Sequence, residues 1–250
     1  MAQDRYFTDL AHKFTSNIYG SYKGAVRQHL LWRDLDALLA QLPPGLSVLD
    51  VGGGAGQTAI GLCQRGHRVR LVEPAAEMLA LAREAAVKAG CTEALTLEQL
   101  PLQQLDGQYQ LVVFHAVLEW LADQRGGLGK VVELVGPGGW LSLLFYNKNA
   151  MDFMHLIRGN FQQFNQGWYG RHKGLTPQAP LDPRQVLAWL AEAGMEVMVH
   201  TGIRCFSDFH LPDRPRPALE EVLAMEEKVS GLEPYRSLAR YVHILARKPG

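Results

Sequence analysis

Cysteine is scarce in this chain, and the few cysteines are poorly placed for disulfides or metal sites. The 250 residues include three, Cys63, Cys91 and Cys205, which are widely spaced and form no C-x-x-C pair. This pattern argues against a disulfide framework and against a zinc site. We therefore expect reduced thiols in the core of a cytoplasmic protein that holds no metal.

Long hydrophobic runs and net charge are missing as well. No apolar run approaches the roughly 20 residues that span a bilayer, and Met1 to Arg5 lack the basic flank and apolar core of a signal peptide. The 25 Lys and Arg residues balance the 25 Asp and Glu residues. We expect neither a membrane nor DNA as a partner, and an RNA partner would need a local positive patch.

What the chain does contain is a glycine-rich turn after an apolar run. The segment Val48-Leu49-Asp50-Val51 leads into Gly52-Gly53-Gly54-Ala55-Gly56. Without Cβ atoms, glycines let backbone N–H groups approach a ligand at the N-terminal end of the next helix. The spacing differs from the G-x-G-x-x-G of a dinucleotide loop. An acid beside the turn would repel phosphate, but it can face an ammonium group or water.

A second acid follows at a distance that suits a nucleoside. Glu73 ends the apolar run 68–72, roughly 20 residues beyond the turn, where a carboxylate accepts hydrogen bonds from ribose hydroxyls. The turn and this acid resemble motif I and the ribose-binding acid of the class I S-adenosylmethionine-dependent methyltransferases. A glycine-rich turn without a ligand is the alternative, and the paired acid makes it the weaker one.

Strand and helix patterns alternate along the chain. Strand patterns occupy 68–72, 95–97, 109–115, 140–146 and 195–203, and the run 240–247 alternates like an antiparallel strand at or near an edge. This order predicts an α/β, Rossmann-like, doubly wound seven-stranded sheet whose last strand is antiparallel. N-terminal helices precede it, one of them around 7–14, and an insertion follows strand five.

We expect one domain over 1–250. Its parts are an N-terminal helical cap (1–45), a cofactor-binding core (46–146), a basic and aromatic insertion (147–182) and a C-terminal part of the core (183–250) with a helical insertion near 212–230. In the last helix, four acids are expected on the solvated face: Glu220, Glu221, Glu226 and Glu227.

The insertion has an excess of positive charge among aromatic residues. Five Lys or Arg residues stand against Asp152 and Asp182 between 147 and 185. Basic groups bind phosphates and aromatic faces stack on unpaired bases, so this mix suits a single-stranded RNA loop. A lid over a small-molecule pocket would use similar residues, and both interpretations stay open. The RNA-binding candidates are Arg171, His172 and Lys173.

Longer strings make the resemblance more specific. They are Tyr19-Gly20, Lys23-Gly24, Arg27-Gln28, the loop 50–60, Phe114-His115-Ala116-Val117-Leu118-Glu119-Trp120, the segment 143–147 and Arg240-Tyr241-Val242-His243. Over nearly its whole length the chain is similar to the bacterial tRNA 5-carboxymethoxyuridine methyltransferases. It departs from them in having Glu73 where Asp is expected, and a sparser basic run at 171–173.

The resemblance implies transfer of a methyl group from S-adenosyl-L-methionine to the carboxylate of 5-carboxymethoxyuridine. The partner would be a tRNA anticodon stem-loop with this nucleoside at its wobble position, and the product the methyl ester 5-methoxycarbonylmethoxyuridine. A carboxylate with a pKa near 4 is already ionised at neutral pH. We therefore expect no essential acid or base residue, only positioning and removal of water.

The resemblance also assigns residues. Gly52 and Gly53 would pass the methionine portion of the cofactor, Arg27 would pair with its carboxylate, Glu73 would hold the ribose, Leu102 and Gln103 would border the adenine, and His115 would sit near the methionine or the methyl group. Candidates for positioning the acceptor carboxylate, chosen by chemical type and chain position, are Tyr146, Arg204 and Arg158. By composition alone Arg27 is more often a solvated helix residue, and His115 a locally bonded polar residue.

Two other functions remain open at this stage. One is a methyltransferase of the same fold that acts on a small metabolite, and the other is a non-catalytic RNA-binding module that retains the cofactor fold. A carboxylated derivative of the cofactor is also open. The sequence does not set the oligomeric state or the tRNA isoacceptors.

Overall fold

The computed structural model describes residues 4, 21–167, 177, 179–210 and 213–250. The strands are β1 Ser47–Val51, β2 Arg68–Val72, β3 Leu95–Glu98, β4 Tyr109–His115, β5 Val135–Tyr146, β6 Glu196–Ile203 and β7 Tyr241–Arg247. The α-helices are α2 Tyr22–Leu39, α3 Gln57–Gln64, α4 Ala76–Ala89, α5 Gln124–Leu134, α6 Lys148–Ile157, α7 Phe161–Asn165, α8 Pro183–Glu192 and α9 Leu219–Val229. Single turns of 3₁₀ helix are η1 Leu102–Gln104, η2 Leu118–Trp120, η3 Ser207–Phe209 and η4 Arg236–Leu238.

The strands form one seven-stranded sheet in the order β3-β2-β1-β4-β5-β7-β6. The pairs from β3 to β5 are parallel, whereas β7 runs antiparallel to both β5 and β6. The predicted Rossmann-like sheet with an antiparallel last strand is confirmed. The strand order reverses between β1 and β4, and open α/β sheets bind ligands at the carboxyl ends of the strands beside such a reversal.

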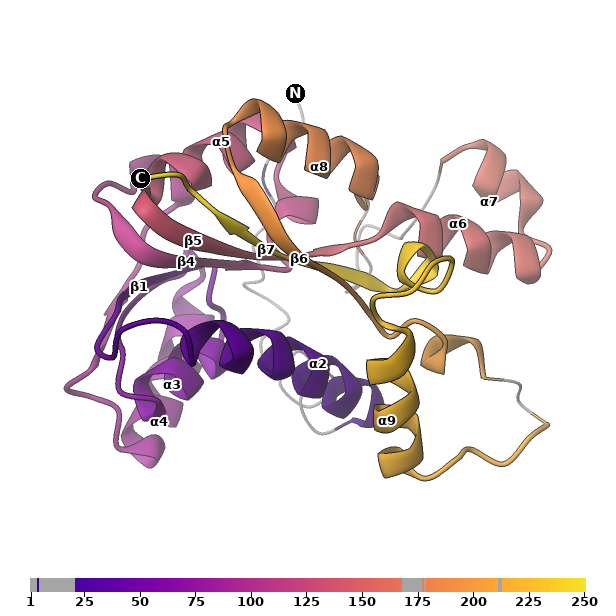
Figure 1. The fold of residues 1–250 in the computed structure, drawn as a ribbon, viewed down its shortest axis with the longest axis horizontal. Coiled ribbons are helices and arrows are strands. Elements are labelled where there is room, and N and C mark those ends of the chain that lie inside the picture. Colours follow the sequence, from indigo (N-terminus) through magenta and orange to yellow (C-terminus); the bar gives the residue numbers. More distant parts are fainter. Residues whose placement is uncertain (1–3, 5–20, 168–176, 178, 211–212) are drawn as a thin grey trace.

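Helices cover both faces of the sheet, with α2, α3 and α4 on one side and α5 and α8 on the other (Figure 1). The central strand β4 contributes to both cores. Leu111 and Val113 pack on the α2 side, while Val112 and Phe114 pack on the α5 side. Because successive side chains of a strand point to opposite faces, a strand covered on both faces has an unbroken apolar run.

Helix α2 lies across the sheet and brings the N-terminal part of the chain to the ligand edge. Its N-cap is Ser21, whose side chain accepts a hydrogen bond from the backbone N–H of Gly24 at 3.1 Å. Val26, Leu30 and Leu35 form its buried stripe and are fully buried. The helix predicted around 7–14 lies outside the described residues.

Local signals placed most helix boundaries correctly. Gly90 ends α4 in the left-handed conformation, Asp123 caps α5, and Pro183 begins α8. Strand β5 was predicted to begin at Trp140 but begins at Val135, because Val135 pairs with Tyr109 across a register shift.

One prediction about α9 is wrong. Glu226, expected among the solvated acids, is fully buried. Its carboxylate accepts the backbone N–H groups of Cys205, Phe206 and Ser207 at 2.7, 3.3 and 3.0 Å. These bonds hold the turn that follows β6, so a tertiary contact overrides the amphipathic pattern of the helix.

The predicted insertion begins with α6 and α7, which project beyond one end of the sheet (Figure 1). Its two ends are joined by a parallel bridge between Asn147 and Leu181. The division of the chain into 1–45, 46–146, 147–182 and 183–250 stays a prediction. The three cysteines are free and buried, and no helix in the described part of the chain is long and apolar enough to cross a membrane.

Candidate functional site

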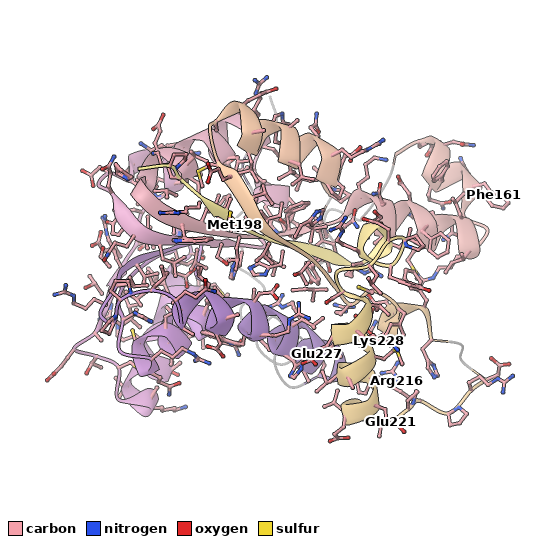
Figure 2. All side chains as sticks on the ribbon, viewed as in Figure 1. Phe161, Met198, Arg216, Glu221, Glu227 and Lys228 are labelled. Atoms are coloured by element: carbon pink, nitrogen blue, oxygen red, sulfur yellow. The ribbon has the colours of Figure 1, made fainter. Side chains whose placement is uncertain are left out.

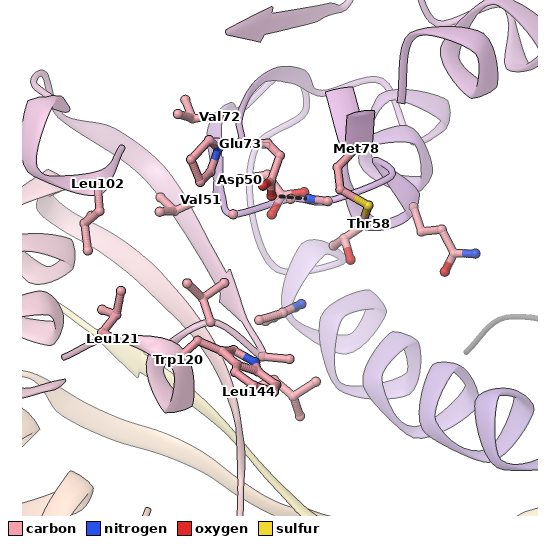
Figure 3. Close-up of a pocket in the computed structure, with 18 of the residues that line it drawn as sticks. Asp50, Val51, Thr58, Val72, Glu73, Met78, Leu102, Trp120, Leu121 and Leu144 are labelled. Atoms are coloured by element: carbon pink, nitrogen blue, oxygen red, sulfur yellow. Dashed lines mark hydrogen bonds between the residues drawn. The ribbon is translucent and has the colours of Figure 1, made fainter. Parts of the chain in front are cut away.

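A pocket lies at the carboxyl ends of β1, β2 and β4 (Figure 3). With part of the open solvent at its mouth it contains about 1140 Å³ of empty space. The residues predicted to bind a cofactor all line it: Arg27, Gly52, Gly53, Glu73, Leu102, Gln103 and His115. Five different segments of the fold therefore meet where the sequence placed one ligand, although the role of each residue stays a prediction.

The glycine turn begins where β1 ends, and it needs glycine for two reasons. Gly52 has φ of 66°, a region that side chains rarely adopt. A Cβ atom there would lie 2.5 Å from Cγ2 of Val117, and one on Gly53 would lie 2.8 Å from Oδ2 of Asp50. The backbone N–H groups of Gly52 and Gly53 donate to the carbonyl of Val72 at 2.7 and 3.3 Å, so β2 holds the turn in place.

Glu73 faces the pocket and is anchored to the turn. Its Oε2 accepts the N–H of Gly54 at 3.1 Å and its Oε1 accepts the N–H of Ala75 at 2.9 Å; Figure 3 marks a hydrogen bond at this carboxylate. Burial raises its pKa, and the two backbone bonds oppose the rise. Each oxygen keeps a lone pair that a ligand hydroxyl could use.

Asp50 is a buried carboxyl that the protein leaves half satisfied. It is 2% exposed, and its Oδ2 has no hydrogen-bond partner among the described residues. Burial raises its pKa to about 7, a backbone hydrogen bond from Ala59 opposes the rise, and the charge of Glu73 adds to it. A cationic group in the pocket would satisfy this oxygen and favour the ionised form.

Arg27 is buried rather than solvated. It is 9% exposed, and its Nε has no hydrogen-bond partner among the described residues. Its guanidinium carbon lies 5.6 Å from the ring centre of Tyr241 in β7. A buried arginine with an unsatisfied N–H in a ligand pocket is suited to bind a ligand carboxylate.

His115 ends β4 and lines the pocket. Its Nε2 lies 2.7 Å from Oγ of Ser142, while its buried Nδ1 has no partner in the described structure. The next residue, Ala116, has φ of 56°, which is unusual for a residue with a Cβ atom. Its N–H donates to the carbonyl of Leu144 at 2.7 Å, which holds this sharp turn against β5.

Leu102 and Gln103 of η1 line the pocket, and the apolar side chain of Leu121 lines it on the same side as Leu102 (Figure 3). The amide Nε2 of Gln103 donates to Oδ2 of Asp4 at 3.1 Å, and the N–H of Ala122 donates to its Oδ1 at 2.8 Å. The N-terminal segment thus reaches the pocket at Asp4, a contact that sequence reasoning did not find. It depends on a pairing of residues about 100 positions apart.

Glu119 belongs to the string 114–120, but the sequence alone did not suggest a role for it. It is 2% exposed, and neither carboxyl oxygen has a hydrogen-bond partner among the described residues. Burial raises its pKa to about 8, although nearby backbone N–H groups of Glu119 and Tyr146 and the charge of Arg27 oppose the rise. Its place beside Arg27 follows from the tight turn after β4, which the string 114–120 did not predict.

Tyr146 and Arg204 are not among the residues that line this pocket, and both lie beside Tyr241. The rings of Tyr146 and Tyr241 meet edge to face, 4.4 Å between centroids, and the guanidinium carbon of Arg204 lies 5.7 Å from the centroid of Tyr241. Burial, with Tyr241 adding to it, holds the pKa of Tyr146 well above its usual value. Its hydroxyl is therefore a neutral donor.

Positive charge gathers around Arg204. Its guanidinium and that of Arg240 both bond to the buried carboxylate of Asp208, Arg240 at 2.7 Å, and Nζ of Lys23 lies 3.4 Å from the same carboxylate. Burial alone would raise the pKa of Asp208, but the charges of Arg204 and Arg240 lower it well below its usual range. Three cations around one carboxylate leave an excess of two positive charges.

The remaining candidates are not part of this group. Arg158 is exposed at the C-terminal end of α6, so the structure does not bring it together with Tyr146 and Arg204. Arg171, His172 and Lys173 lie outside the described residues. Among the residues that are described, no three His, Cys, Asp or Glu side chains gather as a metal site.

Comparison with known proteins gives one family and one group of close relatives. The family model of the methyltransferase domain matches residues 24–200. The tRNA 5-carboxymethoxyuridine methyltransferase of Escherichia coli K12 is 42% identical over 254 aligned positions, which cover 99% of this chain and 97% of the relative. A ubiquinone biosynthesis O-methyltransferase of Pseudomonas aeruginosa is 29% identical, over 66% of this chain and 69% of the relative.

Solved structures share the fold at low identity. The magnesium protoporphyrin IX methyltransferase of Synechocystis, solved with bound S-adenosylhomocysteine, superposes with a TM-score of 0.67 at 18% identity and covers 97% of this chain and 96% of its own. The cyclase SpnF has a TM-score of 0.63 at 16% identity and covers 100% of this chain and 99% of its own. Methyltransferases and a cyclase thus have this fold, so the fold alone does not define the reaction.

Proposed function

The chain belongs to the methyltransferase-domain family and, within it, to the bacterial tRNA 5-carboxymethoxyuridine methyltransferases, and from this premise we propose how its site works. It moves a methyl group from S-adenosyl-L-methionine to the carboxylate of 5-carboxymethoxyuridine in tRNA. A carboxylate oxygen bonds to the methyl carbon, the carbon–sulfur bond breaks, and a methyl ester and S-adenosylhomocysteine result.

The pocket fits this cofactor. Its methionine end has a carboxylate and an ammonium group, and the pocket offers an unsatisfied N–H on Arg27 and an unsatisfied oxygen on Asp50. Glu73 suits the ribose hydroxyls, and the turn at Gly52 and Gly53 leaves no room for a Cβ atom. When bound, the cofactor supplies an electrophilic methyl group on a positively charged sulfur.

The acceptor carboxylate is assigned to Arg204 and Tyr146, which lie beside Tyr241. This assignment is supported by the nearness of both arginines to one ring: the guanidinium carbons of Arg27 and Arg204 lie 5.6 and 5.7 Å from the ring centroid of Tyr241. The residue proposed for the cofactor carboxylate and the one proposed for the acceptor carboxylate thus both lie close to the same side chain. Arg204 supplies a cation, and Tyr146 supplies a neutral hydroxyl that can donate to an anion.

The chain need not move a proton in this reaction. The acceptor carboxylate is ionised at neutral pH, and His115, Asp50 and Glu119 need not take a proton from it. The residues around Tyr241 have to align the carboxylate with the methyl group and exclude water. Because a carboxylate and a sulfonium neutralise each other as the methyl group moves, the dry surroundings favour the reaction.

The partner is tRNA, and we assign its anticodon stem-loop to the side of α6 and α7. Phe161 and Phe164 there are 61% and 37% exposed, and Figure 2 shows Phe161 at the outer end of this arm. Aromatic faces of this kind stack on unpaired bases. The arm adjoins the residues around Arg204 and Asp208. Phe153 of α6 meets Phe209 of η3, the residue after Asp208, edge to face at 5.3 Å between centroids. A cytoplasmic location accords with a tRNA substrate.

The test is methyl transfer from labelled S-adenosyl-L-methionine to two tRNA pools, one with 5-carboxymethoxyuridine and one without it. We expect label only in the first pool and its release by mild alkali, because an ester hydrolyses there and a methylated base does not. Label in both pools, or label that resists alkali, would contradict the proposed acceptor. No label in either pool with intact cofactor binding would indicate a small-molecule acceptor, and no cofactor binding a non-catalytic role.

A further inference from the structure

Four polar side chains form a continuous hydrogen-bonded chain beneath the pocket. Oδ2 of Asp34 in α2 lies 2.8 Å from Nδ1 of His243 in β7. Nε2 of His243 lies 3.0 Å from Oγ of Ser142 in β5, and the same Oγ lies 2.7 Å from Nε2 of His115 in β4. The chain therefore runs from a helix through three adjacent strands to a residue of the pocket wall.

Water has little access to this chain. His243 and Ser142 are 0% exposed and Asp34 is 7% exposed. A buried polar atom that loses its partner has no solvent to replace it, and the loss costs about 1–3 kcal/mol. Each group in this hydrogen-bonded series must therefore donate where its neighbour accepts. The proton positions at one end of the series thus determine those at the other end.

Asp34 determines which atom donates and which accepts in each hydrogen bond of this series. Burial alone would raise its pKa, but the bonds to His243 and Arg33 outweigh burial and lower it, so the group is a carboxylate. Nε and Nη2 of Arg33 hold Oδ1 at 3.0 and 2.7 Å. Oδ2 is left to accept the N–H on Nδ1 of His243. Because Arg33 already balances the charge of Asp34, the fully buried His243 ring needs no second proton.

The remaining protons follow from the donor and acceptor capacity of each group. A neutral His243 with its proton on Nδ1 has a lone pair on Nε2, so the hydroxyl of Ser142 donates to it. The oxygen of Ser142 is then free to accept, and Nε2 of His115 donates to it. His115 therefore has its only N–H on Nε2 and a lone pair on Nδ1, the nitrogen that has no partner among the described residues.

We propose that Asp34, His243 and Ser142 are positioning residues that fix His115 in the tautomer with a bare Nδ1, which presents a lone pair to the cationic end of the cofactor. The opposite tautomer would direct an N–H toward the ammonium and sulfonium groups. It would repel them and leave its own donor unsatisfied in the pocket wall.

The charged surroundings of His115 agree with a neutral ring. Burial lowers its pKa well below the usual value, and the charge of Arg27 lowers it further. Arg27 comes from α2 and His243 from β7, whose ring stands edge to face with that of His115 at 5.8 Å between centroids. A second positive charge in this place would oppose a cationic ligand.

The inference rests on the cofactor-binding part of the proposed function and not on the tRNA acceptor, so it is tested without tRNA. The full chain with ¹⁵N-labelled histidine gives the protonation of both nitrogens of His115 by NMR, and calorimetry gives the affinity for S-adenosyl-L-methionine. We expect Nδ1 bare and Nε2 protonated at neutral pH. A protonated Nδ1 would overturn the proposal, whether or not the wild-type chain binds the cofactor.

The variant Asp34→Asn tests which atom donates in each hydrogen bond between residue 34 and His115. Arg33 holds the amide oxygen, so the NH₂ group faces Nδ1 of His243 and reverses each proton in turn. We expect Nδ1 of His115 to become protonated and the dissociation constant of the cofactor to rise about tenfold or more. Asp36→Asn is the matched control, since Asp36 lies on the same helix but pairs at the surface with Arg65 at 2.6 Å.

Ser142→Ala keeps the test decisive if Asp34→Asn fails to fold. It removes one hydroxyl and disconnects His115 from His243 without adding volume. We expect the NMR signals of His115 to show a mixture of tautomers and the cofactor affinity to fall by a smaller factor than in Asp34→Asn. A His115 tautomer and a cofactor affinity that stay as in the wild type would overturn the proposal.

Discussion

At the scale of single residues, the site is distinguished by buried polar atoms that the protein itself does not satisfy. Nε of Arg27, Oδ2 of Asp50, Nδ1 of His115 and both oxygens of Glu119 are buried without a partner among the described residues. Native proteins rarely leave such atoms unpaired. Three of these four residues line one pocket, and their chemistry is complementary to a ligand with a carboxylate and an ammonium group.

Replacing Arg27 by alanine should remove the partner of the cofactor carboxylate. A hydrogen bond to a charged group is worth about 1.5–3 kcal/mol, so the dissociation constant for S-adenosyl-L-methionine should rise roughly 10- to 100-fold. Calorimetry measures this directly. Arg83→Ala, at an exposed position of α4, is the control and should bind normally. Near-normal affinity in Arg27→Ala would refute the assignment.

Glu119 should make the stability of the ligand-free chain depend on pH. Its pKa is raised from 4.5 to about 8 in the folded chain, so between these values the native state keeps a proton that the unfolded state loses. Stability then falls as pH rises through this window. Glu119→Gln has no proton to lose and should be more stable than the wild type at pH 9, by about 1–4 kcal/mol, with little difference at pH 4.5.

Denaturant unfolding at the two pH values measures this difference. Glu77→Gln, at an exposed position of α4, is the matched control and should show no such dependence. If Glu119→Gln is equally stable relative to the wild type at both pH values, the Glu119 carboxyl is not held protonated by burial.

At the scale of elements, local sequence patterns predicted the strands and helices whose apolar residues match the faces that are buried. The run 109–115 has apolar residues for both faces and is β4 as predicted. Glu226 shows where this fails. Its place in an amphipathic helix predicts solvent exposure, but three N–H groups from 205–207 bind it inside the fold. No helical pattern contains that contact.

The residues of the candidate site fall into the same two classes: those that a local pattern predicts and those that depend on tertiary contacts. The glycine turn, Glu73 and His115 stand at the ends of strands, and a parallel sheet brings such ends together, so the sequence predicted them. The nearness of Tyr241 to two arginines depends on the pairing of β7 with β5 and on the packing of α2, neither of which a linear pattern contains. Arg158 was chosen by chemical type and chain position, and it lies exposed at the C-terminal end of α6, where no contact with Tyr146 or Arg204 is found among the described residues.

Gly52→Ala should separate crowding from backbone strain. Gly52 and Gly45 have similar φ values, 66° and 73°, but a Cβ atom on Gly52 meets Val117 whereas one on Gly45 has nothing within 4 Å. Both alanine variants should lose about 1 kcal/mol of stability from the left-handed conformation, and Gly52→Ala should lose more, because its Cβ atom would lie 2.5 Å from Cγ2 of Val117. Only Gly52→Ala should also weaken cofactor binding, by more than tenfold in calorimetry. Equal cofactor affinity in the two variants would contradict a close approach at Gly52.

At the scale of the whole molecule, net charge is zero, so attraction to RNA must come from local groups. The cations around Asp208 are one such group. If about three phosphates are neutralised, the KM for tRNA should rise roughly tenfold or more between 50 and 200 mM salt. The dissociation constant of the cofactor should change far less, because cofactor binding does not release counterions from a polyanion. Steady-state kinetics at several salt concentrations measure the difference, and an equal, shallow dependence of both constants would argue for a small acceptor.

The contact between Asp34 and His243 joins positions 209 residues apart. A ribosome makes Asp34, the glycine turn and β4 well before it makes β7. A chain interrupted before Tyr241 would therefore contain the glycine turn, but it would lack Tyr241 and the partner that orients His115. Chains without β7 would then be unable to engage either substrate fully, and methyl transfer would be restricted to chains in which β7 has already been made.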